Sequence, residues 1–168
     1  MKLSNVVKSA LPAAFVGVMA LSLTPISAFA STSTTTTFAV TATVQSTCLV
    51  SASSMSFGTY TGAAAPSTST VTVTCTNTTP YTVGLNAGTA TGATVTTRQM
   101  TGPSSALLNY ALYSDSARTV NWGNTTGSWV SGTGSGSGQG LTVYGQAAAG
   151  QYVTPGSYTD TITATVTY

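Results

Sequence analysis

Few residues in this 168-residue chain could do chemistry. The sequence contains no histidine and no glutamate, and its only acidic residues are Asp115 and Asp160. Without those two residue types, a serine or cysteine nucleophile has no histidine base, and a pair of glutamates for acid/base catalysis cannot be assembled. Both lysines lie in the first eight residues, and neither aspartate sits in an aspartic-protease-like sequence. The sequence therefore predicts that the protein is not an enzyme.

The same inventory limits metal and cofactor binding. Two aspartates without histidine cannot build a zinc cage or a carboxylate-rich calcium site, although this does not exclude calcium held by backbone carbonyls. The Gly-Ser run over residues 132–138 lacks the lysine that a phosphate-binding loop would carry. We expect no cofactor and no metal site.

Residues 1–30 have the pattern of a secretory signal peptide. Two lysines, Lys2 and Lys8, precede an apolar region over residues 10–23, and Ala28-Phe29-Ala30 offers a cleavage site. The alternative is a membrane anchor, for which the apolar run is short. Cleavage after Ala30 would leave one domain with two arginines and two aspartates, so it would carry no net charge and no basic patch for nucleic acid.

Export also decides the state of the two cysteines. Secreted proteins fold in an oxidising compartment, so we expect Cys48 and Cys75 to form a disulfide. On the chain-entropy description, closing a loop of this length could stabilise the fold by up to about 3.5 kcal/mol.

Composition and patterning predict an all-β protein. Threonine, which favours strands through its branched β-carbon, is abundant, and short alternating segments are separated by glycine, proline and asparagine turns. Such a pattern fits a β-sandwich or a Greek-key barrel. We expect strands near residues 48–50, 71–75, 81–85, 95–100, 107–113, 119–122, 141–145 and 158–168, a loop from about 61 to 69, and a flexible loop over 130–139.

A further alternating segment precedes the cysteines. Four apolar side chains lie on one face of an extended chain, with smaller or polar residues between them: Phe38, Val40, Ala42 and Val44. The Ser/Thr tract of residues 31–37 has no such periodicity, and we expect it to be mobile. By periodicity alone, residues 38–44 would be the first strand of a self-sufficient sandwich.

Two weaker patterns point to sugars. Asn77-Thr78-Thr79 and Asn124-Thr125-Thr126 match the glycosylation sequon, which arises easily by chance in a threonine-rich chain. Trp122 and Trp129 could stack on a carbohydrate, although aromatic residues of small sandwiches more often fill the core. A secreted, monomeric carbohydrate-binding sandwich is therefore the alternative function.

A series of short motifs resembles the spore coat protein U domain family, which includes the major subunits of archaic chaperone-usher pili. In chain order the motifs are Phe57-Gly58-Thr59-Tyr60, Cys75, Arg98-Gln99-Met100, Leu108 to Asp115, Trp122-Gly123, Tyr144-Gly145 and Gly156 to Thr161. Their order and spacing fit across nearly the whole chain after residue 30. One departure is the stretch from Gln146 to Ala149, where the family often carries a basic residue.

The resemblance implies an immunoglobulin-like β-sandwich that lacks its last strand. A periplasmic chaperone and an outer-membrane usher handle such a subunit, and the N-terminal extension of the next subunit completes it. Residues 1–30 would then be the signal peptide, 31–45 the extension and 46–168 the pilin domain. The donor strand would present Phe38, Val40, Ala42 and Val44, and the groove-edge strand would present Ile162, Ala164, Val166 and Tyr168.

The function implied by this resemblance is structural. We expect a subunit of a surface pilus, fibre or spore-coat-like polymer, exported through the periplasm to the cell surface, that supports adhesion or biofilm formation. Its partners would be identical or related subunits in a head-to-tail polymer, the chaperone and the usher, with no nucleic acid. A single domain favours a shaft subunit over a tip adhesin.

Overall fold

The computed structural model describes residues 30–168, so the expected signal peptide lies outside the described residues except for Ala30. The chain divides into two units, residues 1–41 and residues 42–168. Residues 30–47 form neither helix nor strand. Within the described part of the chain, no helix is long and apolar enough to cross a membrane.

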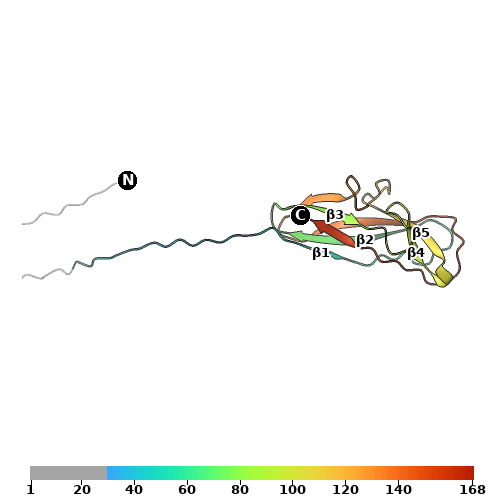
Figure 1. Cartoon of the computed structure of the whole chain (residues 1–168), viewed down its shortest axis with the longest axis horizontal. Coiled ribbons are helices and arrows are strands. Elements are labelled where there is room, and N and C mark those ends of the chain that lie inside the picture. Colours follow the sequence, from blue (N-terminus) through green and yellow to red (C-terminus); the bar gives the residue numbers. More distant parts are fainter. Residues whose placement is uncertain (1–29) are drawn as a thin grey trace, which may run out of the picture. The chain divides into compact units, whose positions relative to one another are not determined.

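The second unit is an all-β sandwich of two antiparallel sheets, as the sequence predicts (Figure 1). One sheet has the strand order β1-β2-β7-β5-β4, and the other has the order β6-β3-β8. The strands are β1 (Cys48–Ala52), β2 (Ala65–Cys75), β3 (Pro80–Leu85), β4 (Arg98–Thr101), β5 (Leu107–Tyr113), β6 (Val130–Thr133), β7 (Gln139–Ala147) and β8 (Ala164–Thr167); a short 3-10 turn, η1 (Pro103–Ser105), follows β4.

The core lies between the two sheets and is built from every second residue of the strands. Successive side chains of a strand point to opposite faces, so the alternation seen in the sequence places one set inward. The buried apolar side chains are Val71, Val73, Cys75, Tyr81, Val83, Leu85, Leu108, Tyr110, Leu112, Trp122, Val143 and Ala147. The outward set is largely threonine, serine and glycine, which give this nearly uncharged protein its polar surface.

The predicted disulfide is confirmed. Cys48 and Cys75 face each other across the antiparallel pair of β1 and β2, with their Cα atoms 4.1 Å apart. β2 is the only strand that forms backbone hydrogen bonds with β1 within residues 30–168. The disulfide therefore fixes the start of an edge strand to the sheet.

Two predicted loops are wrong in part, because each contains strand residues beside residues 61–64 and 134–138, which lie in no strand. β2 begins at Ala65, since the serines and threonines that follow it pair with β7. Residues 130–139 include β6 and the first residue of β7. Gly132 of β6 pairs with Tyr81, and a side chain at Gly132 would collide with the Tyr81 ring. This glycine makes room for packing and does not create flexibility.

Two predicted strands near the middle of the chain are shorter or absent. β4 begins at Arg98 and not at residue 95, because Thr94 and Thr97 close a turn through both of their backbone amides. Residues 119–122 form one isolated bridge, between Asn121 and Tyr113, and no strand.

The C-terminal strand is also shorter than predicted. β8 covers Ala164–Thr167 and pairs with β3, whereas the expected strand began at residue 158. Residues 158–163 make one isolated bridge, between Thr159 and Thr101. In Figure 1 the red β8 lies beside β1 and β3, which belong to different sheets. The segment before β8 therefore runs along a boundary where the sandwich is open.

Candidate functional site

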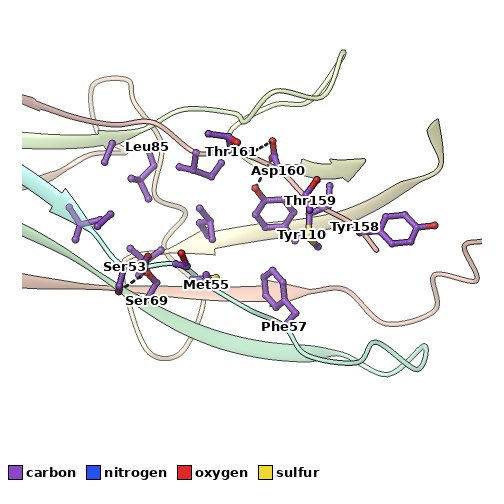
Figure 2. Close-up of a pocket in the computed structure, with 18 residues that line it drawn as sticks. Ser53, Met55, Phe57, Ser69, Leu85, Tyr110, Tyr158, Thr159, Asp160 and Thr161 are labelled. Atoms are coloured by element: carbon purple, nitrogen blue, oxygen red, sulfur yellow. Dashed lines mark hydrogen bonds between the residues drawn. The ribbon is translucent and has the colours of Figure 1, made fainter. Parts of the chain in front are cut away.

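An open groove follows this boundary and has a volume of about 460 Å³. The first wall is the stretch from Ala52 to Phe57, and the second wall is residues 158–164 (Figure 2). Core side chains form the floor between the walls: Val71, Leu85, Met100, Tyr110, Leu112 and Val143. The groove therefore reaches down to side chains of the core, of which all but Met100 are buried.

The walls of the groove lack a strand between them. β1 pairs with β2 alone and β8 with β3 alone among the described residues. The second wall bonds to the body of the domain on one side, where the backbone amide of Thr159 donates to Thr101 and that of Asn86 donates to the Thr163 carbonyl. An unpaired strand edge on each side of an apolar floor can accept an added strand.

Asp160 anchors the second wall to the domain. Its Oδ1 atom accepts hydrogen bonds from the backbone amide and the hydroxyl of Thr89, both at 2.8 Å, and from the Thr161 amide at 2.7 Å. Its Oδ2 atom accepts a bond from the Tyr110 hydroxyl at 2.7 Å. Burial and then this bond raise the pKa of Tyr110, so the hydroxyl stays protonated and donates. Figure 2 shows Tyr110 between Phe57 and Asp160.

A second anchor passes through Asn86 to a buried arginine. The side-chain Oδ1 atom of Asn86 accepts a hydrogen bond from the backbone amide of Thr163 at 2.9 Å. The backbone carbonyl of Asn86 accepts one from Nε of Arg98 at 2.8 Å. The fully buried Arg98 also donates to the carbonyls of Leu85, Val95 and Trp122. Burial lowers the pKa of Arg98 to about 10, so the guanidinium stays charged at neutral pH and its four carbonyl partners replace water.

The groove continues into a second cavity of about 730 Å³. Both cavities are lined by Met55, Phe57, Met100 and Tyr158. Residues 151–158 form a loop that lines the second cavity, and Gln151 holds this loop in place. The Gln151 side chain accepts a hydrogen bond from the backbone amide of Asn109 at 2.7 Å and donates one to the backbone carbonyl of Asn109 at 2.9 Å. No charged residue lines this cavity in the described part of the chain.

The comparison with known families decides where the chain belongs. Residues 34–165 match the Spore Coat Protein U domain. The chain belongs to the spore coat protein U domain family. The match covers both the alternating segment before Cys48 and nearly all of the sandwich, so the resemblance of the motifs is confirmed.

Individual relatives of this spore coat protein U domain agree with the assignment. Protein U of Myxococcus xanthus is 38% identical over 79 residues, which are 47% of this chain and 44% of that protein. The chain thus matches less than half the length of this curated relative. A crystal structure of the CsuC-CsuE chaperone-tip adhesion subunit pre-assembly complex, from the archaic chaperone-usher Csu pili of Acinetobacter baumannii, matches with a TM-score of 0.59 and 23% identity. This match covers 75% of our chain and 41% of that chain, and it shows a shared fold.

The four predicted groove-edge residues of this spore coat protein U domain lie in three different environments. Ile162 and Ala164 line the groove. Val166 is half-buried and packs against the core, whereas Tyr168 is exposed and lines neither cavity. Two of the four residues are therefore available to a strand in the groove.

The predicted donor residues belong to no helix or strand. The side chains of Phe38, Val40 and Val44 are each more than 80% exposed, at 85%, 83% and 86%. No strand within residues 30–168 includes residues 38–44, and their role as a donor strand stays a prediction. The chain thus exposes both an apolar segment and an apolar groove.

The two tryptophans lie in different environments. Trp122 is buried, and its Nε1 atom donates to the Val83 carbonyl at 2.8 Å, so the core position that the sequence favours is confirmed for this residue. Trp129 is 38% exposed and lines neither cavity. Residues 30–168 also contain no group of three or more histidine, cysteine or acidic residues that could hold a metal ion.

Some residues of the site carried no signal in the sequence. Met55, Asn86 and Gln151 stand in ordinary polar or loop sequence and belong to none of the motifs. Asp160 and Arg98 do belong to motifs, but their partners are far away in the chain: Thr89 lies 71 residues before Asp160, and Trp122 lies 24 residues after Arg98. Only the folded chain brings these groups to the second wall.

Proposed function

We propose that the protein is a structural subunit of a surface fibre, in which residues 38–44 of one subunit fill the groove of the next. The observation that carries this proposal is the open apolar groove between β1 and the C-terminal segment. A partner strand would protect such a groove, because an open apolar groove between two free strand edges is an aggregation hazard.

The lengths of the donor segment and the groove agree. Residues 38–44 would extend over about 20 Å at roughly 3.3 Å per residue, and the second wall, residues 158–164, also has seven residues. Alternate side chains would point to the floor while the backbone pairs with both walls. Burying one phenylalanine, two valines and one alanine could contribute about 6 kcal/mol before the cost of ordering the segment.

Donation between copies makes an open chain of subunits. The donor segment and the groove are different surfaces of one subunit, so the contact is head-to-tail and propagates without closing. Before the groove is filled, a chaperone would have to protect it from aggregation. The structurally similar Csu subunit was solved with a chaperone, which supports a periplasmic chaperone and an outer-membrane usher as partners of this chain too. We further propose cell-surface localisation and a role in adhesion or biofilm formation.

Assembly of two matched variants tests the function. Val40→Asp places a charge on the face that enters the groove, so we expect fibre formation to be abolished while export continues. Thr41→Asp places the same charge on the opposite face, and we expect fibres to form. The variants are expressed with the chaperone and usher, and fibres are scored by electron microscopy and by the size of the surface material. Fibres from both variants at equal yield would refute donation by this segment.

A further inference from the structure

The second cavity is larger than the donor segment requires. The seven residues of the donor segment, 38–44, are enough to pair along the whole second wall. None of them would then occupy the adjoining cavity of about 730 Å³. Tyr152 stands at this cavity with its side chain 93% exposed, the most exposed large hydrophobic side chain of the described residues. Backbone and side-chain bonds of the preceding Gln151 hold the loop in place, so the ring projects from a fixed support.

The direction of the incoming strand follows from where each subunit's own donor segment leaves. That segment joins the domain at Cys48, and β8 ends beside β1 at the same end of the groove. If the incoming Val44 lay at this end, the body of the donating subunit would compete for the space from which the acceptor's donor segment departs. An open polymer therefore needs Val44 at the opposite end, beside Tyr158 and the second cavity.

The linker between the donor strand and its own domain is short. Three uncharged polar residues, Gln45, Ser46 and Thr47, separate Val44 from the disulfide at Cys48. Even fully extended, the chain from Val44 to Cys48 spans no more than about 14 Å. The linker must therefore cross the second cavity as it leaves the groove.

We propose that the second cavity seats Gln45, Ser46 and Thr47 of the next subunit, with Tyr152 as the principal contact. The cavity has no charge and mixes hydroxyl, amide and aromatic groups, which suits an uncharged polar linker. Seating the linker adds a second contact to each junction and restricts how one subunit can rotate against the next. This inference rests on the proposed donor-strand function and extends it beyond the groove.

Peptide binding to a full chain tests the inference. The acceptor is the Val40→Asp chain, whose own donor strand is disabled while its groove is intact. The probes are peptides of residues 36–44, 36–47 and 31–44, and their affinities are measured by calorimetry. We expect the 36–47 peptide to bind about tenfold more tightly than the 36–44 peptide, and Tyr152→Ala to remove this advantage while the 36–44 affinity stays the same. Val120→Ala is the control, because Val120 is exposed but lines neither cavity.

The outcomes separate the two proposals. Equal affinities for the 36–44 and 36–47 peptides, or an advantage that survives Tyr152→Ala, would overturn the linker seat and leave the groove function standing. A Tyr152-dependent gain from the 31–44 peptide would overturn it as well, because the strand would then run in the opposite direction. If no peptide binds the acceptor, both the linker seat and the donor-strand function fail.

Discussion

Replacing Asp160 by alanine should destabilise the domain and weaken capture of the donor strand. The carboxylate accepts four hydrogen bonds, of which two come from the exposed Thr89 and one from the exposed backbone of Thr161. Water can replace the carboxylate at those three donors. The fourth donor is the hydroxyl of the buried Tyr110, which would lose the only hydrogen-bonding partner that it has among residues 30–168. An unsatisfied buried group costs about 1 to 3 kcal/mol, so we expect Asp160→Ala to lower the free energy of unfolding by the same amount.

A double-mutant cycle isolates the Tyr110 contribution. Tyr110→Phe removes the stranded hydroxyl, so the combined loss in Asp160→Ala with Tyr110→Phe should be smaller than the sum of the single losses. Unfolding is followed in urea on the Val40→Asp chain. Additive losses would show that the hydroxyl is not the group left unsatisfied.

Asp115 provides the matched control for the groove. It is the other aspartate, and it also accepts bonds from the amide and hydroxyl of a threonine, Thr119, as well as from the Val120 amide. These bonds close a turn whose residues line neither cavity. We expect Asp160→Ala to weaken binding of the 36–47 peptide at least tenfold and Asp115→Ala to leave it unchanged. Equal affinities in the two variants would refute Asp160 as the anchor of the second wall.

Three further predictions concern the frame of the groove. Replacing both cysteines by serine should cost about 3 kcal/mol of stability and loosen the pairing of β1 with β2. Hydrogen exchange at the backbone amides of β1 should become faster, and unchanged exchange would contradict this role of the disulfide. The pKa of Tyr110 is raised in the folded protein, while an unfolded tyrosine titrates near its usual value of about 10. The contribution of Tyr110 to stability should therefore be constant below that pH and fall above it. Tyr110→Phe should flatten this fall in urea melts between pH 8 and 11, and an equally steep fall in the variant would count against the shift. Gly134→Ala would push a methyl group into the backbone of Thr76 and should lower the free energy of unfolding by about 1 to 3 kcal/mol, as measured by thermal unfolding. Gly140→Ala, whose new methyl group would make ordinary contacts only, should change stability little. Equal stability losses in the two variants would argue against tight packing at Gly134.

The predictable parts of the fold are those where local pattern and tertiary environment agree. β3 and β5 fall within one residue of their predicted bounds, because strict alternation marks strands with one face buried. The core position of Trp122 and the prediction of a flexible loop over residues 130–139 show where the sequence pattern is ambiguous. Glycine serves equally well in a mobile loop and beside a large ring, and only the position of Tyr81 distinguishes the two cases at Gly132.

The sequence by itself determined the all-β class, the disulfide and the family. Threonine content, period-two alternation, cysteine number and motif order are properties of the chain that need no coordinates. Only the tertiary structure decided that the C-terminal strand stops short, that a groove opens beside it, and that Asp160, Asn86 and Arg98 hold its wall. The physical reason is that a strand extends only where a neighbour satisfies its backbone, and which neighbours are present depends on residues far apart in the chain.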